Sequence, residues 1–264
     1  MSPQRLGQHF LADAGWRGQI LDRIAPAKDQ VWVEIGAGSG QMTRDLAMRA
    51  GRVIAIEIDR ALAQQLRENT EGLPVEVVEG DVLRLDLVGL AAPRFRVYGS
   101  LPYYITSPIL RKLFLIADHL DEIDVVIQWE VARRVAAQPG GSEYGWLSLL
   151  SRFYTSPEIL LRIPPGAFRP PPQVDSALVL LTPPGERARL KLENEERFLK
   201  FALQGFGQKR KTLANNLKTS YGAQAVRETL QALGLEMQAR AEQIGIADMA
   251  KLFRILEIQE GRNA

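Results

Sequence analysis

Hydrophobic residues in the first two-thirds of the chain form short continuous runs that are separated by longer amphipathic segments. The runs are rich in β-branched residues and lie at 31–35, 53–58, 75–80, 95–100 and 124–129. Between them, apolar residues recur with helical spacing, as in 41–50 and 60–69. Because strands that alternate with helical segments form βαβ units, this pattern predicts an α/β fold with a mostly parallel, doubly wound sheet.

The pattern changes in the next part of the chain. Two apolar runs, 158–163 and 176–181, have no helical segment between them. They are joined by the proline-rich segment 164–175, which reads PPGAFRPPPQVD. We therefore predict that the two runs form an antiparallel hairpin that closes the sheet.

Helical spacing without strands characterises the rest of the chain. It is clear at 196–206, 223–233 and 246–259, which predicts a small all-helical domain. A Pro-Pro-Gly stretch at 183–185 separates the two patterns. We therefore predict a Rossmann-like domain over residues 1–183 and a helical C-terminal domain over residues 184–264.

Composition narrows the chemistry that is open to this fold. The 264 residues include no cysteine and only two histidines, His9 and His119. Thiolate catalysis, disulfides and metal sites rich in cysteine or histidine are therefore excluded, and no metal is expected. No apolar run reaches the roughly 18 residues of a membrane span, and the N-terminus lacks the apolar core of a signal peptide. We therefore expect a cytoplasmic protein without a membrane segment.

Charge is unevenly distributed, although the formal net charge is only +2. From Pro183 to the end there are 14 Lys and Arg against 10 Asp and Glu, whereas the preceding residues hold 19 against 21. This excess favours contact between the C-terminal part and a polyanion. On charge alone, a solvated helical surface explains it equally well.

A glycine-rich motif follows the first strand directly. Residues 34–40 read EIGAGSG, and glycine lets such a turn approach a ligand at the start of the next helix. The second strand ends near Glu57, where Rossmann-type folds place a carboxylate on ribose hydroxyls. The third strand ends at Gly80-Asp81, so three motifs converge on one edge of the sheet. Taken singly, Glu57 is also explained as a surface carboxylate, and Asp81 as a turn residue.

The spacing of the glycines distinguishes two nucleotide cofactors. The dinucleotide fingerprint is G-x-G-x-x-G, whereas residues 36–40 follow G-x-G-x-G. Asp81 offers an acceptor for the exocyclic amine of a bound adenine. Together these features favour S-adenosylmethionine over NAD.

The fourth strand ends in the most specific signal of the chain, Gly99-Ser100-Leu101-Pro102-Tyr103. Adenine N6 is a poor nucleophile, so its amine must be held with the lone pair directed at the methyl carbon of the donor. In this interpretation the Ser100 hydroxyl and the Leu101 carbonyl accept the two N–H bonds of the amine. Tyr103 stacks on the base, and Pro102 stiffens the turn. The alternative is an ordinary proline-containing turn after a strand.

With these motifs the chain resembles the KsgA-type rRNA adenine N6,N6-dimethyltransferases, with the Erm methyltransferases as cousins. The matching segments are GQHFL at 7–11, VEIGAGSG at 33–40, IEID at 56–59, GD at 80–81, SLPYYITSPIL at 100–110, EYGWLSLL at 143–150, FRPPPQVDSA at 168–177, FGQKRKTLANNL at 206–217 and RAEQI at 240–244. VDSA and KRKTL look more like the KsgA branch. The resemblance implies cofactor contacts from His9, Leu11, Gly36, Gly38, Glu57, Asp81 and Ser100.

The resemblance also implies an activity. The family transfers methyl groups from S-adenosylmethionine to N6 of two adjacent adenosines in the 3′-terminal hairpin loop of small-subunit (16S) rRNA, during ribosome biogenesis and as a monomer. Two alternatives stay open for this chain. One is an Erm-like enzyme for large-subunit rRNA, and the other is a ribosome-assembly factor with weak catalysis.

Three positions depart from the family pattern. Ser100 stands where the family usually has Asn, and its hydroxyl is a shorter acceptor than an amide oxygen. His9 replaces the Asn of the N-terminal motif, and Tyr104 replaces an Asn that follows the tyrosine. These departures bear on the second methylation and on the cofactor and base pockets, but not on the fold.

Two further features point toward RNA. The basic triplet Lys209-Arg210-Lys211 is suited to phosphates, which position RNA without reading its sequence. Outside the family pattern such a triplet is more often a solvated surface. Phe168 precedes three prolines and is predicted either to stack on the target base opposite Tyr103 or to be a core aromatic under the hairpin. Because the target adenine must leave its stack or be unpaired already, a hairpin loop is a natural substrate.

Overall fold

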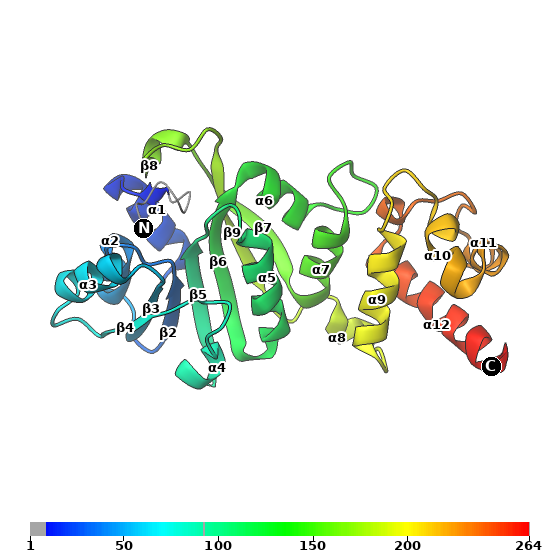
Figure 1. Cartoon of the computed structure of the whole chain (residues 1–264), viewed down its shortest axis with the longest axis horizontal. Helices are drawn as coiled ribbons and strands as arrows, with labels where there is room; N and C mark the ends of the chain where they lie inside the picture. The colour runs from blue at the N-terminus through cyan, green and yellow to red at the C-terminus, as the bar shows by residue number, and fades with distance from the viewer. Residues whose placement is uncertain (1–8, 92, 264) are drawn as a thin grey trace. The chain divides into compact units, whose positions relative to one another are not determined.

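The computed structural model describes residues 9–91 and 93–263, so Gly7 and Gln8 of the N-terminal motif lie outside the described residues. A seven-stranded sheet has the order β4-β3-β2-β5-β6-β9-β7 (Figure 1). The strands are β2 Val31–Ile35, β3 Arg52–Glu57, β4 Val75–Glu79, β5 Phe95–Ser100, β6 Leu120–Gln128, β7 Ser156–Ile163 and β9 Ser176–Thr182. The helices of this part are α1 Ala14–Ile24, α2 Gln41–Ala47, α3 Arg60–Asn69, α4 Leu87–Leu90 and α5 Thr106–Leu115.

The sheet is parallel over five strands and antiparallel over the last two. β4, β3, β2, β5 and β6 pair in parallel, whereas β9 pairs antiparallel with both β6 and β7. The predicted parallel sheet and its closing hairpin are therefore confirmed. The carboxyl ends of β2, β3, β4 and β5 lie at one edge, because their registers match residue for residue. This edge is where ligands bind in open α/β sheets.

The core follows from the continuous apolar runs of the central strands. Trp32, Val33, Ile54, Val97 and Val125 are fully buried, as expected when helices cover both faces of a parallel sheet. Several predicted strand bounds were wrong, because the predicted runs 53–58, 75–80 and 124–129 correspond to strands at 52–57, 75–79 and 120–128. β6 ends at Gln128, and Trp129 is the first residue of α6 Trp129–Ala136.

A second, two-stranded sheet was not predicted. β1 Phe10–Leu11 pairs antiparallel with β8 Phe168–Arg169, which lies within the proline-rich segment. The backbone N–H groups of Ala12 and Asp13 both donate to the carbonyl of Ala167, at 3.0 and 3.1 Å. The N-terminal segment, residues 9–13, is therefore held against the connection between the two strands of the hairpin.

The chain divides into two compact units. The second is formed by Arg133–Thr155 together with Pro184–Ala264. Its helices are α7 Trp146–Tyr154, α8 Arg187–Leu190, α9 Glu195–Gly205, α10 Leu213–Tyr221, α11 Ala223–Ala232 and α12 Ile246–Asn263. Residues 133–155, which the sequence assigned to the first domain, thus pack with the helical part. The reason is aromatic packing, because the ring of Phe153 on α7 lies 5.6 Å from that of Phe198 on α9.

Two features are absent from the described residues. None of the helices within them combines the length and the apolar character that crossing a membrane requires. Over 9–91 and 93–263, no three or more His, Asp or Glu side chains gather in a way suited to a metal ion.

Candidate functional site

A cavity of about 270 Å³ lies within the first unit, at the carboxyl edge of the sheet. Three segments form most of its wall: the N-terminal segment with β1, the turn from β2 into α2, and the turn after β5. The lining residues are His9, Phe10, Leu11, Ala12, Glu34, Gly36, Ala37, Ser39, Gln41, Met42, Tyr98, Ser100, Leu101, Pro102, Tyr103, Val126, Phe168, Arg169 and Ser176. The structure thus brings the glycine-rich motif and the motif at 100–103 to one cavity.

The glycine-rich turn has a backbone that only glycine adopts easily. Gly36, Gly38 and Gly40 have φ angles of +73°, +60° and +90°. A Cβ atom on Gly38 would lie 2.9 Å from the ring of Phe10, so the N-terminal segment packs directly on this turn. A Cβ on Gly36 would meet nothing closer than the Ser100 carbonyl at 3.8 Å, so the backbone there borders open space. The turn is therefore a cradle for a ligand.

Glu57 holds the glycine-rich turn in place. Its side chain is only 1% exposed, and its two oxygens accept hydrogen bonds from the N–H groups of Gly38, at 2.8 Å, and Asp59, at 2.9 Å. It is not among the residues that line the cavity. A carboxylate has about four acceptor positions, so two remain for a ligand after these bonds. The structure thus adds a role that the sequence did not predict, because Glu57 fixes the glycine turn.

Asp81 follows β4 and is half-buried. One of its oxygens accepts the N–H of Leu83 at 2.9 Å, and the other lies 3.6 Å from the guanidinium of Arg84. Asp81 is also outside the lining of the cavity. Its predicted contact with an adenine stays a prediction.

The turn after β5 is fixed by its backbone. The N–H of Leu101 donates to the carbonyl of Val126 at 3.0 Å, and the carbonyl of Pro102 accepts from the N–H of Ile105 and the hydroxyl of Thr106, both at 3.1 Å. Ser100 is half-buried at the cavity wall. Among the described residues its hydroxyl has no hydrogen-bond partner. A free hydroxyl on a fixed turn is a suitable acceptor for a ligand.

Tyr103 and His9 meet on one side of the cavity. Their ring centroids are 5.4 Å apart at an interplanar angle of 33°. The Tyr103 hydroxyl shares a hydrogen bond with that of Ser176 at 3.1 Å, and burial raises the pKa of Tyr103. A ring nitrogen of His9 lies 2.8 Å from the Pro170 carbonyl. The departure at His9 therefore places the N-terminal motif next to Tyr103, whose stacking on a base stays a prediction.

Phe168 lines the cavity but is only 1% exposed and packs within the hydrophobic core. Its burial supports the second of the two alternatives, a core aromatic under the hairpin. Tyr104, in contrast, is 59% exposed and does not line the cavity.

Two buried polar side chains of the cavity were missed. Glu34 on β2 and Tyr98 on β5 are directly opposite each other, and each has an oxygen with no hydrogen-bond partner among the described residues. Burial raises the pKa of Glu34 to about 8, and the charge of Glu57 adds to the rise. A glutamate inside the apolar run VWVEI was a signal that could have revealed this residue.

The basic triplet lies in the second unit. Lys209, Arg210 and Lys211 are all exposed, and two of them border a hollow of about 390 Å³ that Tyr144, Trp146 and Phe206 also line. The ammonium of Lys209 donates to the carbonyl of Ser142 at 3.3 Å. The half-buried Trp146 and Phe206 thus share this hollow with Lys209 and Lys211, a combination that single-stranded nucleic acid binds well, whereas Tyr144 is only 1% exposed.

The likeness to known proteins extends over nearly the whole chain. Residues 2–257 match the family model described as ribosomal RNA adenine dimethylase. A ribosomal RNA small subunit methyltransferase A from Koribacter versatilis is 41% identical, over 97% of this chain and 94% of that protein. The protein of the same name from Xanthomonas campestris is 38% identical, over 95% of this chain and 94% of that protein.

Two solved structures have the same architecture along their length. A dimethyladenosine transferase from Plasmodium falciparum superposes with a TM-score of 0.82 at 25% identity, over 96% of this chain and 98% of that one. The 23S rRNA methyltransferase ErmE superposes with a TM-score of 0.72 at 28% identity, over 94% of this chain and 99% of that one. The predicted pairing of a Rossmann-like fold with a helical C-terminal part is therefore confirmed.

Proposed function

The chain belongs to the ribosomal RNA adenine dimethylase family, and we propose that it dimethylates N6 of two adjacent adenosines in the 3′-terminal hairpin loop of small-subunit rRNA. S-adenosylmethionine is the methyl donor. The observation that carries the proposal is the meeting of the glycine-rich turn and the turn at Ser100–Tyr103 in one cavity. Relatives named for the small ribosomal subunit favour this substrate over the large-subunit rRNA of the Erm branch.

The residues present fit the proposed cofactor. The glycine-rich turn forms a cradle that a side chain would fill. Among the described residues, one carboxylate oxygen of Glu34 and the hydroxyl of Tyr98 have no hydrogen-bond partner, so both can bond to a ligand in the cavity. His9, Leu11, Gly36 and Gly38 would hold the cofactor along the N-terminal segment and the turn. Glu57 would accept the ribose hydroxyls, and Asp81 the adenine amine. When bound, the cofactor supplies a methyl group on a positively charged sulfur.

The turn after β5 would orient the accepting amine. Its two N–H bonds would be accepted by the Ser100 hydroxyl and the Leu101 carbonyl, so that the lone pair faces the methyl carbon. Tyr103 would stack on the base, while Pro102 keeps the turn rigid. No general base is needed, because the amine loses its proton after it has become cationic.

The helical unit would bind RNA outside the catalytic cavity. Lys209, Arg210 and Lys211 would neutralise phosphates, which makes binding salt-dependent without reading sequence. We expect the protein to act as a monomer on a pre-30S particle in the cytoplasm, without a metal ion.

Methyl transfer from labelled S-adenosylmethionine to undermethylated small subunits tests the proposal, with mass analysis of the nucleosides. Dimethyladenosine at two adjacent loop positions is the expected product. Large ribosomal subunits are the control substrate. Methylation of large subunits but not of small subunits would establish the Erm-like alternative. If the protein binds cofactor and small subunits but transfers no methyl, it is an assembly factor instead.

Replacing Ser100 with asparagine is expected to raise the fraction of dimethylated product about two- to threefold. The amide oxygen reaches further than the hydroxyl and holds the bulkier monomethylamine in place for the second transfer. The ratio of dimethyl to monomethyl adenosine at fixed time measures this. Tyr104→Asn is the matched control, because this exposed residue also departs from the family pattern. Equal ratios in S100N and the unchanged protein would contradict the role of Ser100.

Replacing Tyr103 with alanine is expected to lower kcat/KM for small subunits about tenfold, because stacking on a base is worth roughly 1–3 kcal/mol. Tyr103→Phe keeps the ring and loses only the bond to Ser176, so its kcat/KM should stay within about threefold. Steady-state methyl transfer measures both. Equal losses in the two variants would show that the hydroxyl, not the ring, is what matters.

A further inference from the structure

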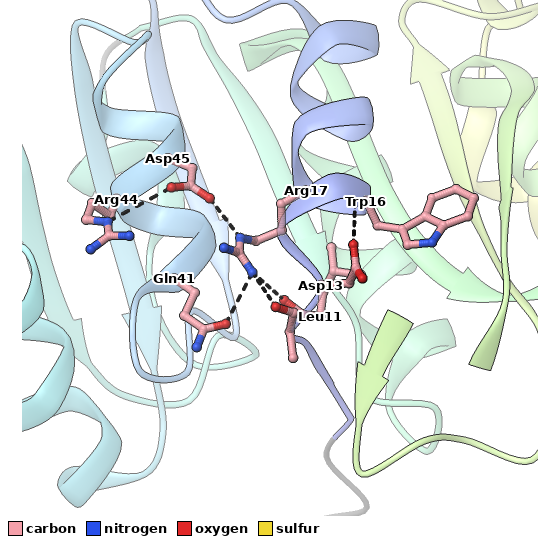
Figure 2. Close-up of polar contacts among 8 residues, drawn as sticks. Leu11, Asp13, Trp16, Arg17, Gln41, Arg44 and Asp45 are labelled. Atoms are coloured by element: carbon pink, nitrogen blue, oxygen red, sulfur yellow. Dashed lines mark hydrogen bonds and ion pairs between the residues drawn. The ribbon is translucent and has the colours of Figure 1, made fainter. Parts of the chain in front are cut away.

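Arg17 is a buried cation that lies outside every motif discussed above. It is on α1, and its side chain is only 9% exposed. The helix begins after Asp13, whose carboxylate accepts the N–H of Trp16 at 3.0 Å. Figure 2 shows Arg17 reaching away from α1 toward α2 on one side and toward Leu11 on the other. A guanidinium so far from water needs several acceptors.

The contacts of Arg17 fall on two segments of the chain. Its Nε donates to the carboxylate of Asp45 on α2 at 2.7 Å. Its Nη1 donates to the Ala12 carbonyl at 2.8 Å, to the Gln41 side-chain oxygen at 3.3 Å and to the Leu11 carbonyl at 3.4 Å. One side chain thus joins the N-terminal segment to the start of α2.

Both segments are walls of the cavity. Leu11 and Ala12 line it from the N-terminal side, and Gln41 lines it from the start of α2, directly after the glycine-rich turn. The Phe10 ring packs against Gly38 in that turn. On the opposite side, the N-terminal segment is held by β8 and by the Ala167 carbonyl. Within the part of the chain that the structure describes, the bonds from Arg17 form a polar connection between the N-terminal segment and α2.

The geometry of the guanidinium suits this connection. Its planar fork presents donors in fixed directions, so that it serves a carboxylate and backbone carbonyls at the same time. Lysine has one ammonium on a flexible stem and reaches only part of this set. An apolar side chain would leave the acceptors of both segments without their donor, although water reaches Asp45, which is 24% exposed.

We propose that Arg17 is a positioning residue that holds the N-terminal segment against the glycine-rich turn, so that the cofactor cavity is formed before the cofactor binds. This role rests on the proposed function, because it takes S-adenosylmethionine as the ligand of the cavity. Arg17 is not part of the cavity lining, and it acts through the segments that are. Its loss should therefore affect binding of the cofactor more than the chemical step.

The experiment compares Arg17→Met with Arg44→Met. Arg44 is the matched control, because it lies on α2 next to Asp45, with its Nε 4.0 Å from the same carboxylate that Arg17 contacts, but is 54% exposed. We expect R17M to raise both the Kd for S-adenosylhomocysteine, by calorimetry, and the KM for S-adenosylmethionine about tenfold. Its kcat should stay within about twofold. Equal values for R17M and R44M, or a fall in kcat with KM unchanged, would overturn the proposal.

Hydrogen exchange without cofactor gives a readout that is independent of activity. In R17M the amides of Ala12 and Asp13 should exchange at least about tenfold faster, whereas those of β2 and β3 should be unchanged. Uniformly faster exchange would indicate general loss of stability and overturn the proposal. If R17M does not fold, Arg17→Lys is used instead. We then expect the Kd, the KM and the exchange rates of the Ala12 and Asp13 amides to rise by smaller factors. Failure of the unchanged protein to bind the cofactor would refute the proposed function rather than the role of Arg17.

Discussion

Replacing Glu57 with alanine is expected to weaken binding of S-adenosylmethionine by about 100-fold or more. The carboxylate accepts the N–H groups of Gly38 and Asp59 in a fully buried position. Hydrogen bonds to a charged group contribute roughly 1.5–3 kcal/mol each, and about 1.4 kcal/mol corresponds to a tenfold change in affinity. Alanine removes both bonds from the turn, together with the acceptor proposed for the ribose. Glu57→Gln keeps one acceptor oxygen and should lose about tenfold.

Calorimetric titration with S-adenosylhomocysteine measures this effect without any RNA. Glu79→Ala is the control, because Glu79 is paired in register with Glu57 on the neighbouring strand but is 40% exposed and contacts Arg67 only at 3.8 Å. Its affinity should stay within about twofold of the unchanged protein. An E57A protein that is folded and binds as tightly as E79A would contradict both roles assigned to Glu57.

The sequence pattern was sufficient for the parts of the fold that depend on local apolar runs. β2 and β5 have the predicted bounds, because most residues of both runs are buried in the middle of a parallel sheet. Once these strands are parallel, their carboxyl ends must share an edge. Gly36, Glu57, Asp81 and Ser100 could therefore be placed near one another without any knowledge of their contacts.

The parts that could not be predicted depend on contacts between residues far apart in the chain. β1 and β8 have two residues each, so they have no hydrophobic period, and nothing local indicates that Leu11 pairs with Phe168. The contacts of Arg17 with Ala12 and Asp45 likewise require the folded arrangement of α1 and α2. The assignment of α7 to the helical unit depends on the packing of Phe153 against Phe198, which sequence order conceals.

Glu34 shows how a buried carboxyl makes stability depend on pH. Burial raises its pKa from 4.5 to about 8 in the folded protein, and the charges of Glu57 and Asp45 contribute to the rise. Between these two pKa values the folded protein holds a proton that the unfolded chain has released. Stability must therefore fall as pH rises from about 4.5 to about 8, and the loss is complete above the folded pKa.

Glutamine at position 34 removes this loss, because it resembles the protonated carboxyl and does not titrate. We expect Glu34→Gln to be more stable than the unchanged protein by a few kcal/mol at pH 8.5, since each pKa unit corresponds to about 1.4 kcal/mol. At pH 5 the difference should nearly vanish. Urea unfolding of both proteins without cofactor measures this difference in stability at each pH. Subtracting one free energy of unfolding from the other cancels the contribution of titrating groups that both proteins share, such as Asp124, whose pKa is also raised by burial.

Glu76→Gln distinguishes burial from a general effect of removing a carboxylate. Glu76 is a strand residue like Glu34, but it is 49% exposed and paired with Arg52 at 2.6 Å. Replacing it should lower the free energy of unfolding only slightly at any pH, because exposed ion pairs contribute about 0–1 kcal/mol to stability. A gain for E34Q that is the same at pH 5 and pH 8.5 would mean that Glu34 is ionised throughout in the folded protein. It would then hold its charge at the cavity wall, where the positive sulfur of the proposed cofactor would be its natural partner.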